Sequence, residues 1–247
     1  MPNEINIIIS GGGTGGHLFP AIAISDQLLK SNPKFNVHFV GSIYGIEKKT
    51  LTLNKLNHTL LPISGFQRQI NLKSIYKNFM LPYRLIKSKL LIKNLFKELK
   101  PKLIIGTGGY ASALPLIEGI QRGIPLIIQE QNAFPGITTR WFSRKAEKVF
   151  IAFKEAQSHI EKKCILTGNP VRDNIDKGNR EQGLKSFSFK NNIKTVLIFG
   201  GSQGSLFLNR IISKIIESLC IHEIQFLWQT GPNHYQEFKK FENKIVK

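Results

Sequence analysis

The sequence is poor in cysteine, and it contains no apolar run long enough to cross a membrane. Its two cysteines, Cys164 and Cys220, form neither a disulfide framework nor a metal-binding spacing, so we expect both to be reduced packing residues. A membrane-spanning helix needs roughly 18–20 apolar residues. The first residues, Met1–Glu4, also lack the basic segment that begins a signal peptide. These absences disfavour a secreted disulfide-rich domain and predict a protein that acts in the cytoplasm.

Acidic residues are also scarce. The chain has 35 lysines and arginines against 16 aspartates and glutamates, which gives a formal charge of +19. Such an excess favours anionic partners, such as nucleic acid, acidic lipid headgroups or phosphorylated substrates. A lysine-rich solvated surface accounts for the charge equally well, so charge by itself leaves the partner open.

Part of this charge lies in one apolar stretch, because residues 68–102 contain ten basic residues and a single acidic one. Pro82 divides the stretch into two segments. Residues 85–99 fit an ordinary helix packed on a sheet. For residues 72–81 we expect an apolar patch rimmed by lysines that dips into a membrane surface. The residues that we expect to form this patch are Leu72, Ile75 and Phe79.

Strand and helix patterns alternate along the chain, which predicts an α/β fold built on a parallel sheet. The predicted strands are 5–10, 37–41, 103–106, 125–129, 148–152, 163–166, 194–199 and 225–229. The predicted helices are 20–31, 45–54, a pair within 72–100, 114–122, 136–142, 154–160, 205–219 and 234–241.

Residues 168–192 contain few apolar side chains and several turn-forming pairs, so we expect a surface connection there. The boundary near Thr167 gives a first domain of residues 1–166 and a second of residues 167–247. The second domain would have two strands and two helices, which are too few to close a sheet. We therefore expect the chain to be truncated.

Three predicted strands end in glycine-rich turns, at residues 11–16, 106–109 and 200–204. A turn without side chains at the start of a helix presents free N–H groups and the positive end of the helix dipole to an anion. Three such turns in one chain predict ligands that carry phosphate.

The first turn also fits the dinucleotide-binding pattern G-x-G-x-x-G. That pattern requires an acidic residue at the end of the second strand to hold the ribose, but the strand ends with Phe39-Val40-Gly41-Ser42. The chain also lacks the Gly-Lys-Ser/Thr of P-loop proteins. Neither class explains the histidine, His17, that follows the glycines, so both are disfavoured.

Five motifs follow one another along the chain: Gly11–His17 with Pro20, Gly106–Ser112, Glu130–Asn132, Thr167–Arg172 and Gly200–Gly204. Together they resemble the MurG family, whose members add N-acetylglucosamine to the lipid-linked muramyl-pentapeptide precursor of peptidoglycan. The resemblance runs from Ile5 to about Leu219. Gln129 stands where the family commonly has histidine.

The resemblance implies a GT-B fold, in which two Rossmann-like domains carry the two substrates. Residues 1–166 would be the acceptor and membrane domain, and residues 167–247 part of the UDP-sugar domain. The implied reaction is an inverting transfer from UDP-N-acetylglucosamine to the C4 hydroxyl of the muramyl unit of undecaprenyl-pyrophosphoryl-muramyl-pentapeptide. We expect it to need no metal ion and no other cofactor.

Departure of UDP builds negative charge on the pyrophosphate, which fixed dipoles and cations must stabilise. We expect Ser202 and Arg172 to meet this charge, and Asn132 to bind a sugar or phosphate oxygen. Tyr110 would line the acceptor pocket, although a packing role fits it as well. The full set of predicted substrate-binding residues is Thr14, Gly15, Gly16, Tyr110, Asn132, Arg172 and Ser202.

Inversion in one step needs a base that takes the proton from the acceptor hydroxyl. A histidine with its ordinary pKa of about 6.5 suits this task near neutral pH. His17 is the first candidate, and a helix-capping or substrate-orienting role is the alternative for it. Glu130 is the rival base, and its alternative is a structural carboxylate that binds loop amides.

The predicted partners are UDP-N-acetylglucosamine, the undecaprenyl-linked muramyl-pentapeptide and an anionic lipid surface, with no nucleic acid. They imply a peripheral protein on the cytoplasmic face of the bacterial inner membrane. Two other interpretations stay open. One is a GT-B glycosyltransferase with another lipid acceptor, and the other is a non-catalytic protein that binds polyanions through charge alone.

Overall fold

The computed structural model describes residues 4–65, 76, 78–173, 175, 177–201, 203–219 and 223–247. The chain divides into two compact units, Met1–Asp173 (unit 1) and Asn174–Lys247 (unit 2). The division thus falls after residue 173, where the composition had predicted it after residue 166. Three of the predicted site and membrane residues lie outside the described residues: Leu72, Ile75 and Ser202.

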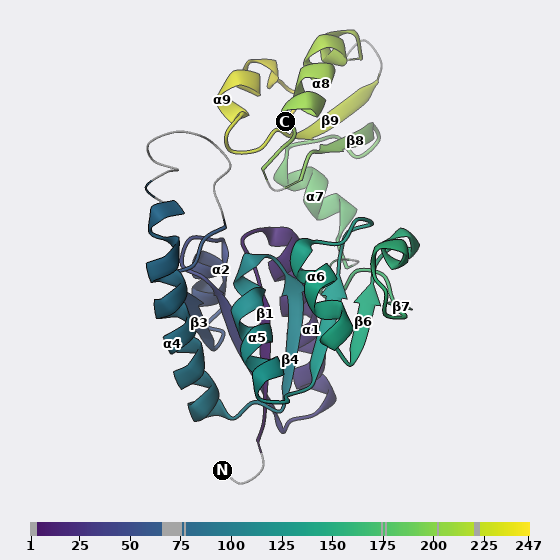
Figure 1. The fold of residues 1–247 in the computed structure, drawn as a ribbon. Coiled ribbons are helices and arrows are strands. Elements are labelled where there is room, and N and C mark those ends of the chain that lie inside the picture. Colours follow the sequence, from purple (N-terminus) through teal and green to yellow (C-terminus); the bar gives the residue numbers. More distant parts are fainter. Residues whose placement is uncertain are drawn as a thin grey trace. The chain divides into compact units, whose positions relative to one another are not determined.

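Unit 1 is built on a parallel sheet of seven strands in the order β3-β2-β1-β4-β5-β6-β7, counted over the described part of the chain (Figure 1). The strands are β1 (Ile5–Gly11), β2 (Phe35–Ser42), β3 (His58–Leu61), β4 (Leu103–Gly108), β5 (Leu126–Glu130), β6 (Lys148–Ile151) and β7 (Ile165–Leu166). Central strands of a parallel sheet are covered on both faces, which accounts for the continuous apolar run of β1. The predicted α/β class is confirmed.

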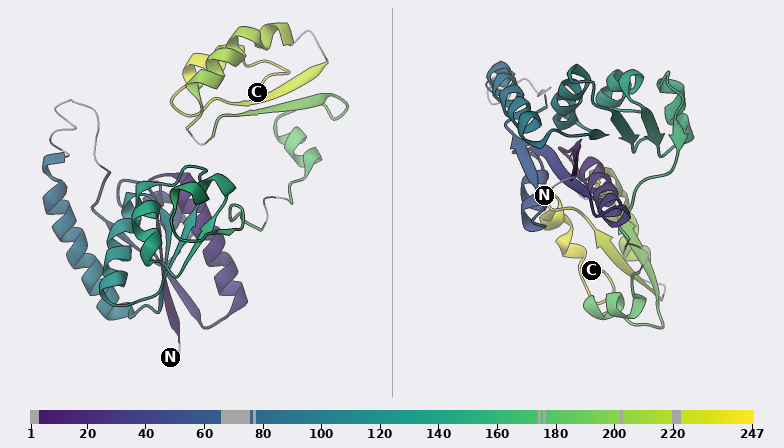
Figure 2. Two further views of the ribbon diagram at one scale, coloured as in Figure 1. Left: turned by 45° about the vertical axis from the view of Figure 1, so that its right-hand side comes forward. Right: turned by 90° about the horizontal axis from the view of Figure 1, so that it is seen from below.

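Helices cover both faces of this sheet (Figures 1 and 2). On one face, Leu18 and Leu51 pack against Ile7 and Ile9 of β1, and on the other face Phe96 belongs to the cluster around Ile8. The helices of the first face are α1 (Gly15–Ser31) and α2 (Glu47–Leu53). Those of the second are α4 (Leu81–Leu99), α5 (Ala113–Gln121) and α6 (Ile137–Phe142). The alternation of β1 side chains between the two clusters fixes which face of the sheet each of them occupies.

The structure corrects several predicted elements of unit 1. α1 begins at Gly15 instead of Pro20, so two of the motif's glycines are helical. β3 was not predicted, because a four-residue edge strand that begins with His58 has no apolar run. Residues 154–159 form a 3-10 helix.

Unit 2 contains the parallel pair β8 (Lys194–Phe199) and β9 (Ile224–Gln229), with α7 (Arg180–Ser186), α8 (Leu206–Leu219) and α9 (Tyr235–Phe238). Its core forms around Trp228, Phe226 and Ile216. α7 lies in the stretch that we predicted as a connection. Asn179 caps it, with its Oδ1 accepting from the Gln182 amide at 3.0 Å.

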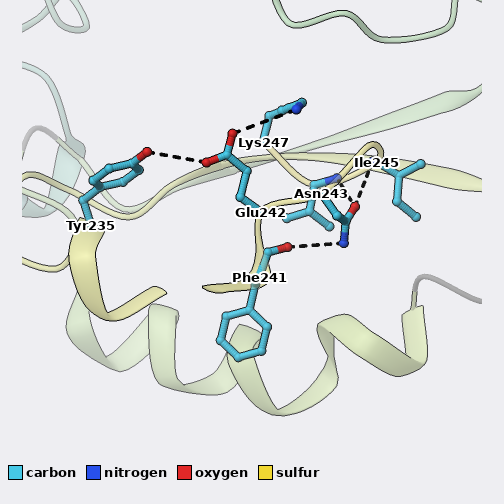
Figure 3. A network of polar contacts seen from close by, with 7 residues as sticks. Tyr235, Phe241, Glu242, Asn243, Ile245 and Lys247 are labelled. Atoms are coloured by element: carbon cyan, nitrogen blue, oxygen red, sulfur yellow. Dashed lines mark hydrogen bonds and ion pairs between the residues drawn. The ribbon is translucent and has the colours of Figure 1, made fainter. Parts of the chain in front are cut away.

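The last residues of unit 2 return alongside β9. Figure 3 shows the turn at Asn243, whose side-chain oxygen accepts hydrogen bonds from the amides of Ile245 at 2.8 Å and Val246 at 3.0 Å. The Phe226 amide then donates to the Ile245 carbonyl, and the Trp228 amide donates to the Lys247 carbonyl, both at 2.7 Å. The segment therefore adds backbone hydrogen bonds to the free edge of β9.

Among the helices that could be searched, which are those of the described residues, none has the length and apolar content needed to cross a bilayer.

Candidate functional site

The order of the strands marks one end of the sheet in unit 1 as the place for a ligand. From β1 the chain moves toward β2 and β3, whereas β4 is followed by β5 and β6 on the opposite side. In open α/β sheets, ligands bind at the carboxyl ends of the strands where the winding reverses. Here that point lies between the carboxyl ends of β1 and β4, where Gly11 pairs with Gly108.

The turn after β1 leaves consecutive backbone amides without acceptors. The Gly12 amide donates to the Gly108 carbonyl at 3.3 Å, and the Gly13 amide donates to Oε1 of Glu47 at 2.7 Å. The next amides, of residues 14–16, have no acceptor among the residues that the structure describes. Thr14, at the N-cap of α1, makes no side-chain cap bond. These three amides and the helix dipole are therefore directed to whatever binds there.

Glu47 holds this turn, a role that was not predicted from the sequence. The side chain is fully buried, and its Oε1 also accepts from the Ser42 amide at 3.2 Å. A Cβ added to Gly12 or Gly45 would lie 1.8 Å from a Glu47 oxygen, so the carboxylate occupies space that only glycines leave. The glycines close to Glu47 in the sequence, Gly41 and Gly45, were the available signal. The turn that Glu47 holds follows β1, however, whereas Glu47 itself follows β2, so the sequence does not show the pairing.

The imidazole of His17 lies between two other segments at the same edge. Its Nδ1 is 3.0 Å from the Thr107 carbonyl oxygen and 3.0 Å from Oε1 of Gln131. The backbone is tied as well, because the Thr107 hydroxyl donates to the His17 carbonyl at 2.9 Å. Thr107 comes from β4 and Gln131 follows β5, so three strand ends converge on this side chain.

The glycines after β4 make room for that imidazole. A Cβ at Gly108 would lie 2.9 Å from Nδ1 of His17, and one at Gly109 would lie 3.2 Å from its Cδ2. Both glycines have a positive φ, of 93° and 79°. We predicted this turn as a phosphate-binding loop, and the structure shows that its missing side chains accommodate a histidine.

Glu130 is buried, and its oxygens are engaged by the loop that follows it. Oε1 accepts from the amide and the side-chain nitrogen of Asn132, at 3.0 and 2.8 Å, and Oε2 accepts from the Gly136 amide at 3.0 Å. This geometry matches the alternative stated for Glu130, a carboxylate that binds loop amides. It also fixes Asn132, whose side chain lies at the surface next to Gln131.

Tyr110 and Arg172 both lie near the first glycine turn. A Cβ at Gly13 would come within 3.0 Å of the Tyr110 ring. Burial raises the pKa of the Tyr110 phenol above its ordinary value, and the charge of Glu47 adds to the rise. The guanidinium of Arg172 lies 5.2 Å from the ring centre of Phe19, in the first turns of α1.

The glycine turn of unit 2 also leads into a helix. The Gly204 amide donates to the Gly201 carbonyl at 2.9 Å. The Ser205 hydroxyl accepts from the Leu208 amide at 3.3 Å, as an N-cap does for α8. Ser202, the predicted pyrophosphate-binding residue of this turn, lies outside the described residues.

Solved structures of known proteins share this architecture. MurG of Acinetobacter baumannii is similar with a TM-score of 0.65 and 22% identity, over 98% of this chain and 64% of that one. A putative UDP-N-acetylglucosamine 2-epimerase from Listeria monocytogenes is similar with a TM-score of 0.64 and 11% identity, over 98% and 68%. At these identities the likeness shows the fold alone. That fold is the α/β, GT-B type of two Rossmann-like domains.

Sequence comparison then gives the family. The model of the glycosyltransferase family 28 N-terminal domain matches residues 7–151, and the model of its C-terminal domain matches residues 195–245. The chain belongs to glycosyltransferase family 28, and the MurG resemblance of its five motifs is confirmed.

Curated relatives cover nearly the whole chain. Proteins from Flavobacterium psychrophilum and Christiangramia forsetii are 38% and 36% identical to it, over 98% and 100% of its length. Both are named UDP-N-acetylglucosamine–N-acetylmuramyl-(pentapeptide) pyrophosphoryl-undecaprenol N-acetylglucosamine transferase. The chain spans 65% and 67% of the length of these two relatives.

Proposed function

We propose that this chain belongs to a glycosyltransferase that moves N-acetylglucosamine from UDP-N-acetylglucosamine to the muramyl unit of undecaprenyl-pyrophosphoryl-muramyl-pentapeptide. The observation that carries the proposal is the identity of 36–38% over 98–100% of the chain to two proteins named for this transfer. The geometry in unit 1 supports it, because a histidine follows unpaired amides at the reversal point of the sheet.

The proposed reaction uses these groups as follows. The C4 hydroxyl of the acceptor attacks the anomeric carbon, the bond from that carbon to the UDP oxygen breaks, and the electron pair leaves with UDP. His17 takes the proton of the hydroxyl. The amides of Thr14–Gly16 and the start of α1 face an anionic group of the substrates, where fixed dipoles stabilise negative charge.

In this proposal Glu130 has a positioning task and not a chemical one. Its oxygens already accept hydrogen bonds from the amides of Asn132 and Gly136, and a proton taken up there would remove the negative charge that strengthens these bonds. The base is therefore assigned to His17.

We further propose that unit 1 attaches reversibly to an anionic membrane surface through residues 79–97. Phe79 is 81% exposed, and Ile86 and Leu90 on α4 are 63% and 59% exposed. Exposed lysines of the same helix surround them: Lys87, Lys89, Lys93 and Lys97. Apolar side chains that enter the headgroup region, together with lysines that attract anionic lipid, give a binding energy that each alone would not supply.

Vesicle sedimentation tests the membrane proposal. Phe79→Glu with Ile86→Glu should weaken binding to vesicles of anionic lipid at least tenfold, because two apolar contacts are lost and two negative charges are added. Thr52→Glu with Leu53→Glu is the matched control, since both residues are exposed on α2 and the charge change is the same. Equal binding of the Phe79/Ile86 variant and the control would end this proposal.

Transfer itself is tested with labelled UDP-N-acetylglucosamine and the lipid-linked muramyl-pentapeptide. Because the chain spans 65% of the Flavobacterium psychrophilum relative, the assay includes a chimera that continues after Lys247 with the remaining residues of that relative. His17→Gln should lower kcat by about 10²–10⁴-fold with little change in the KM for the donor. His159→Gln, an exposed histidine elsewhere in unit 1, is the control.

Unchanged kcat in His17→Gln would remove this residue from the chemistry. Equal kcat/KM for a lipid acceptor without the muramyl unit would replace the proposed acceptor and favour a different glycosyltransferase.

A further inference from the structure

The side-chain amide of Gln131 has its orientation fixed by acceptors. Its Nε2 donates to the Thr107 carbonyl at 2.8 Å, to the Gln129 carbonyl at 3.3 Å and to Oε1 of Gln129. Since all three neighbours are oxygens, the nitrogen of the amide must face them. The oxygen of the amide then faces His17, and Gln131 itself is buried at 8% exposure.

Within the described residues, Nδ1 of His17 therefore meets two oxygens and no donor. The Thr107 carbonyl and Oε1 of Gln131 both lie 3.0 Å from it, and neither oxygen carries a hydrogen. A neutral imidazole has one N–H and one lone pair. If the lone pair were on Nδ1, it would face two acceptors, so the proton must be on Nδ1 and the lone pair on Nε2.

We infer that Gln131, acting with the Thr107 carbonyl, is a positioning residue that selects the Nδ1–H tautomer of His17 and so makes Nε2 its proton acceptor. The same surroundings fix the position of the His17 ring as well as its tautomer. Gly108 leaves space for the ring, and the Thr107 hydroxyl donates a hydrogen bond to the backbone carbonyl of His17.

The consequence for chemistry rests on the proposed function. As the acceptor oxygen bonds to the anomeric carbon and UDP departs with the electron pair, the hydroxyl proton moves to the lone pair of Nε2. The imidazolium that forms keeps its Nδ1–H bonded to the two oxygens, which stabilise its positive charge. Gln131 thus contributes without touching either substrate.

The tautomer can be measured on the unliganded chain. Long-range ¹H–¹⁵N correlation spectra at pH 8 distinguish a ring nitrogen that carries hydrogen from one that carries a lone pair. The chain has six histidines, and the spectrum of His17→Gln identifies the His17 signals by their absence. We expect the hydrogen on Nδ1 of His17. An unconstrained histidine carries it mainly on Nε2, so the result is not trivial.

Two variants of Gln131 separate positioning from simple packing. Gln131→Leu removes one of the two acceptors, and the ratio of Nδ1–H to Nε2–H should fall about fivefold, the worth of one hydrogen bond. Gln131→Glu keeps an oxygen toward Nδ1, and its second oxygen, which replaces the nitrogen that faces the Thr107 and Gln129 carbonyls, must carry a proton to donate to them. In this neutral form the variant should retain the Nδ1–H tautomer. Gln157→Leu is the matched control, because Gln157 also donates to two carbonyls and accepts from one amide, in the same unit.

Each outcome decides the inference. Hydrogen on Nε2 in the unmodified chain would overturn it, as would an unchanged ratio in Gln131→Leu or an equal change in Gln157→Leu. If Gln131→Leu does not fold, loss of the Nδ1–H tautomer in Gln131→Glu has the same meaning. Nδ1–H together with an absence of sugar transfer by the chimera would refute the proposed function and leave the selection of the tautomer by Gln131 intact.

Discussion

The turn after β1 and the turn after β4 are neighbours at the carboxyl edge of the unit 1 sheet, and both are rich in glycine. In the first turn Gly12 leaves space for Glu47, and the amides of residues 14–16 have no acceptor in the described part of the chain. In the second, Gly108 leaves space that the ring of His17 fills, and Gly109 leaves space for the Gly12 carbonyl of the first turn. A missing side chain can thus expose a backbone to a ligand or admit another side chain, and only the neighbours distinguish the two.

The difference between the turn after β1 and the turn after β4 is tested most strongly by adding a methyl group to each. In Gly109→Ala the new Cβ would lie 2.2 Å from the Gly12 carbonyl oxygen, at a φ of 79° that disfavours alanine. We expect the free energy of unfolding to fall by about 3–5 kcal/mol from overpacking and backbone strain. In Gly16→Ala the nearest atom is 3.7 Å away, and stability should change by less than about 1 kcal/mol.

Urea unfolding followed by circular dichroism measures both variants, and hydrogen exchange of the β1 and β4 amides assigns the loss to unit 1. Equal losses in the two variants would show that the turns do not differ as described.

Glu47 provides the next test, because it anchors the first turn from within the protein. Glu47→Ala leaves the buried amides of Gly13 and Ser42 without their acceptor and should lower the free energy of unfolding by about 2–4 kcal/mol. Glu47→Gln keeps one acceptor oxygen and should cost much less. Its nitrogen takes the place of Oε2, which has no partner among the described residues.

Glu155→Ala, at an exposed position in unit 1, is the control for this series and should change stability by about 0.5 kcal/mol or less. A loss in Glu47→Gln as large as in Glu47→Ala, measured by the same urea titration, would mean that the charge and not the hydrogen bonds holds the turn.

A half-buried histidine of the same sheet, His38, gives the background pH dependence of stability against which these variants are compared. His38 on β2 has its pKa lowered to about 4, mainly by burial and also by the nearby His58. The unfolded chain, with a pKa near 6.5, takes up the proton first as the pH falls. Stability is therefore fully present above about pH 6.5 and decreases as the pH falls toward 4.

Since the His38 side chain is only partly buried, solvent screening reduces the effect, and we expect a loss of about 1–2 kcal/mol between pH 7 and pH 4.5. Urea titrations at the two pH values measure it. His38→Gln should flatten this part of the profile and His159→Gln should not, so equal profiles for the two variants would assign the loss to other groups.

Much of the fold followed from local patterns, and the site followed from them only in part. The runs of β1 and β4 were predicted because central parallel strands are apolar throughout. The first turn of α1 was missed, because Gly15 and Gly16 are poor helix formers. The bonds from Glu47 to the Gly13 amide and from Thr107 to the His17 carbonyl, which hold this part of the chain, come from distant segments. α7 had a usable signal in Asn179 and Gln182, which match a helix-start pattern.

Gln131 and Glu47 could not be predicted from their own neighbourhoods. Each acts on a segment that is more than 30 residues away in the sequence, as the separations of 114 between Gln131 and His17 and of 34 between Glu47 and Gly13 show. His17 was found because its motif is local. The residues that orient it become visible only when three strand ends meet.

The smallest expected effect compares the starts of α1 and α8. Ser205 caps α8 through its hydroxyl, so Ser205→Ala should lower the free energy of unfolding of unit 2 by about 1 kcal/mol. Thr14 makes no such bond, so Thr14→Ala should leave the stability of unit 1 within about 0.5 kcal/mol of the unmodified chain. Fluorescence of Trp228, which is buried in unit 2, reports the first variant, and exchange of the α1 amides reports the second. A loss of 1 kcal/mol in Thr14→Ala would mean that this side chain, and not a bound anion, completes the start of α1.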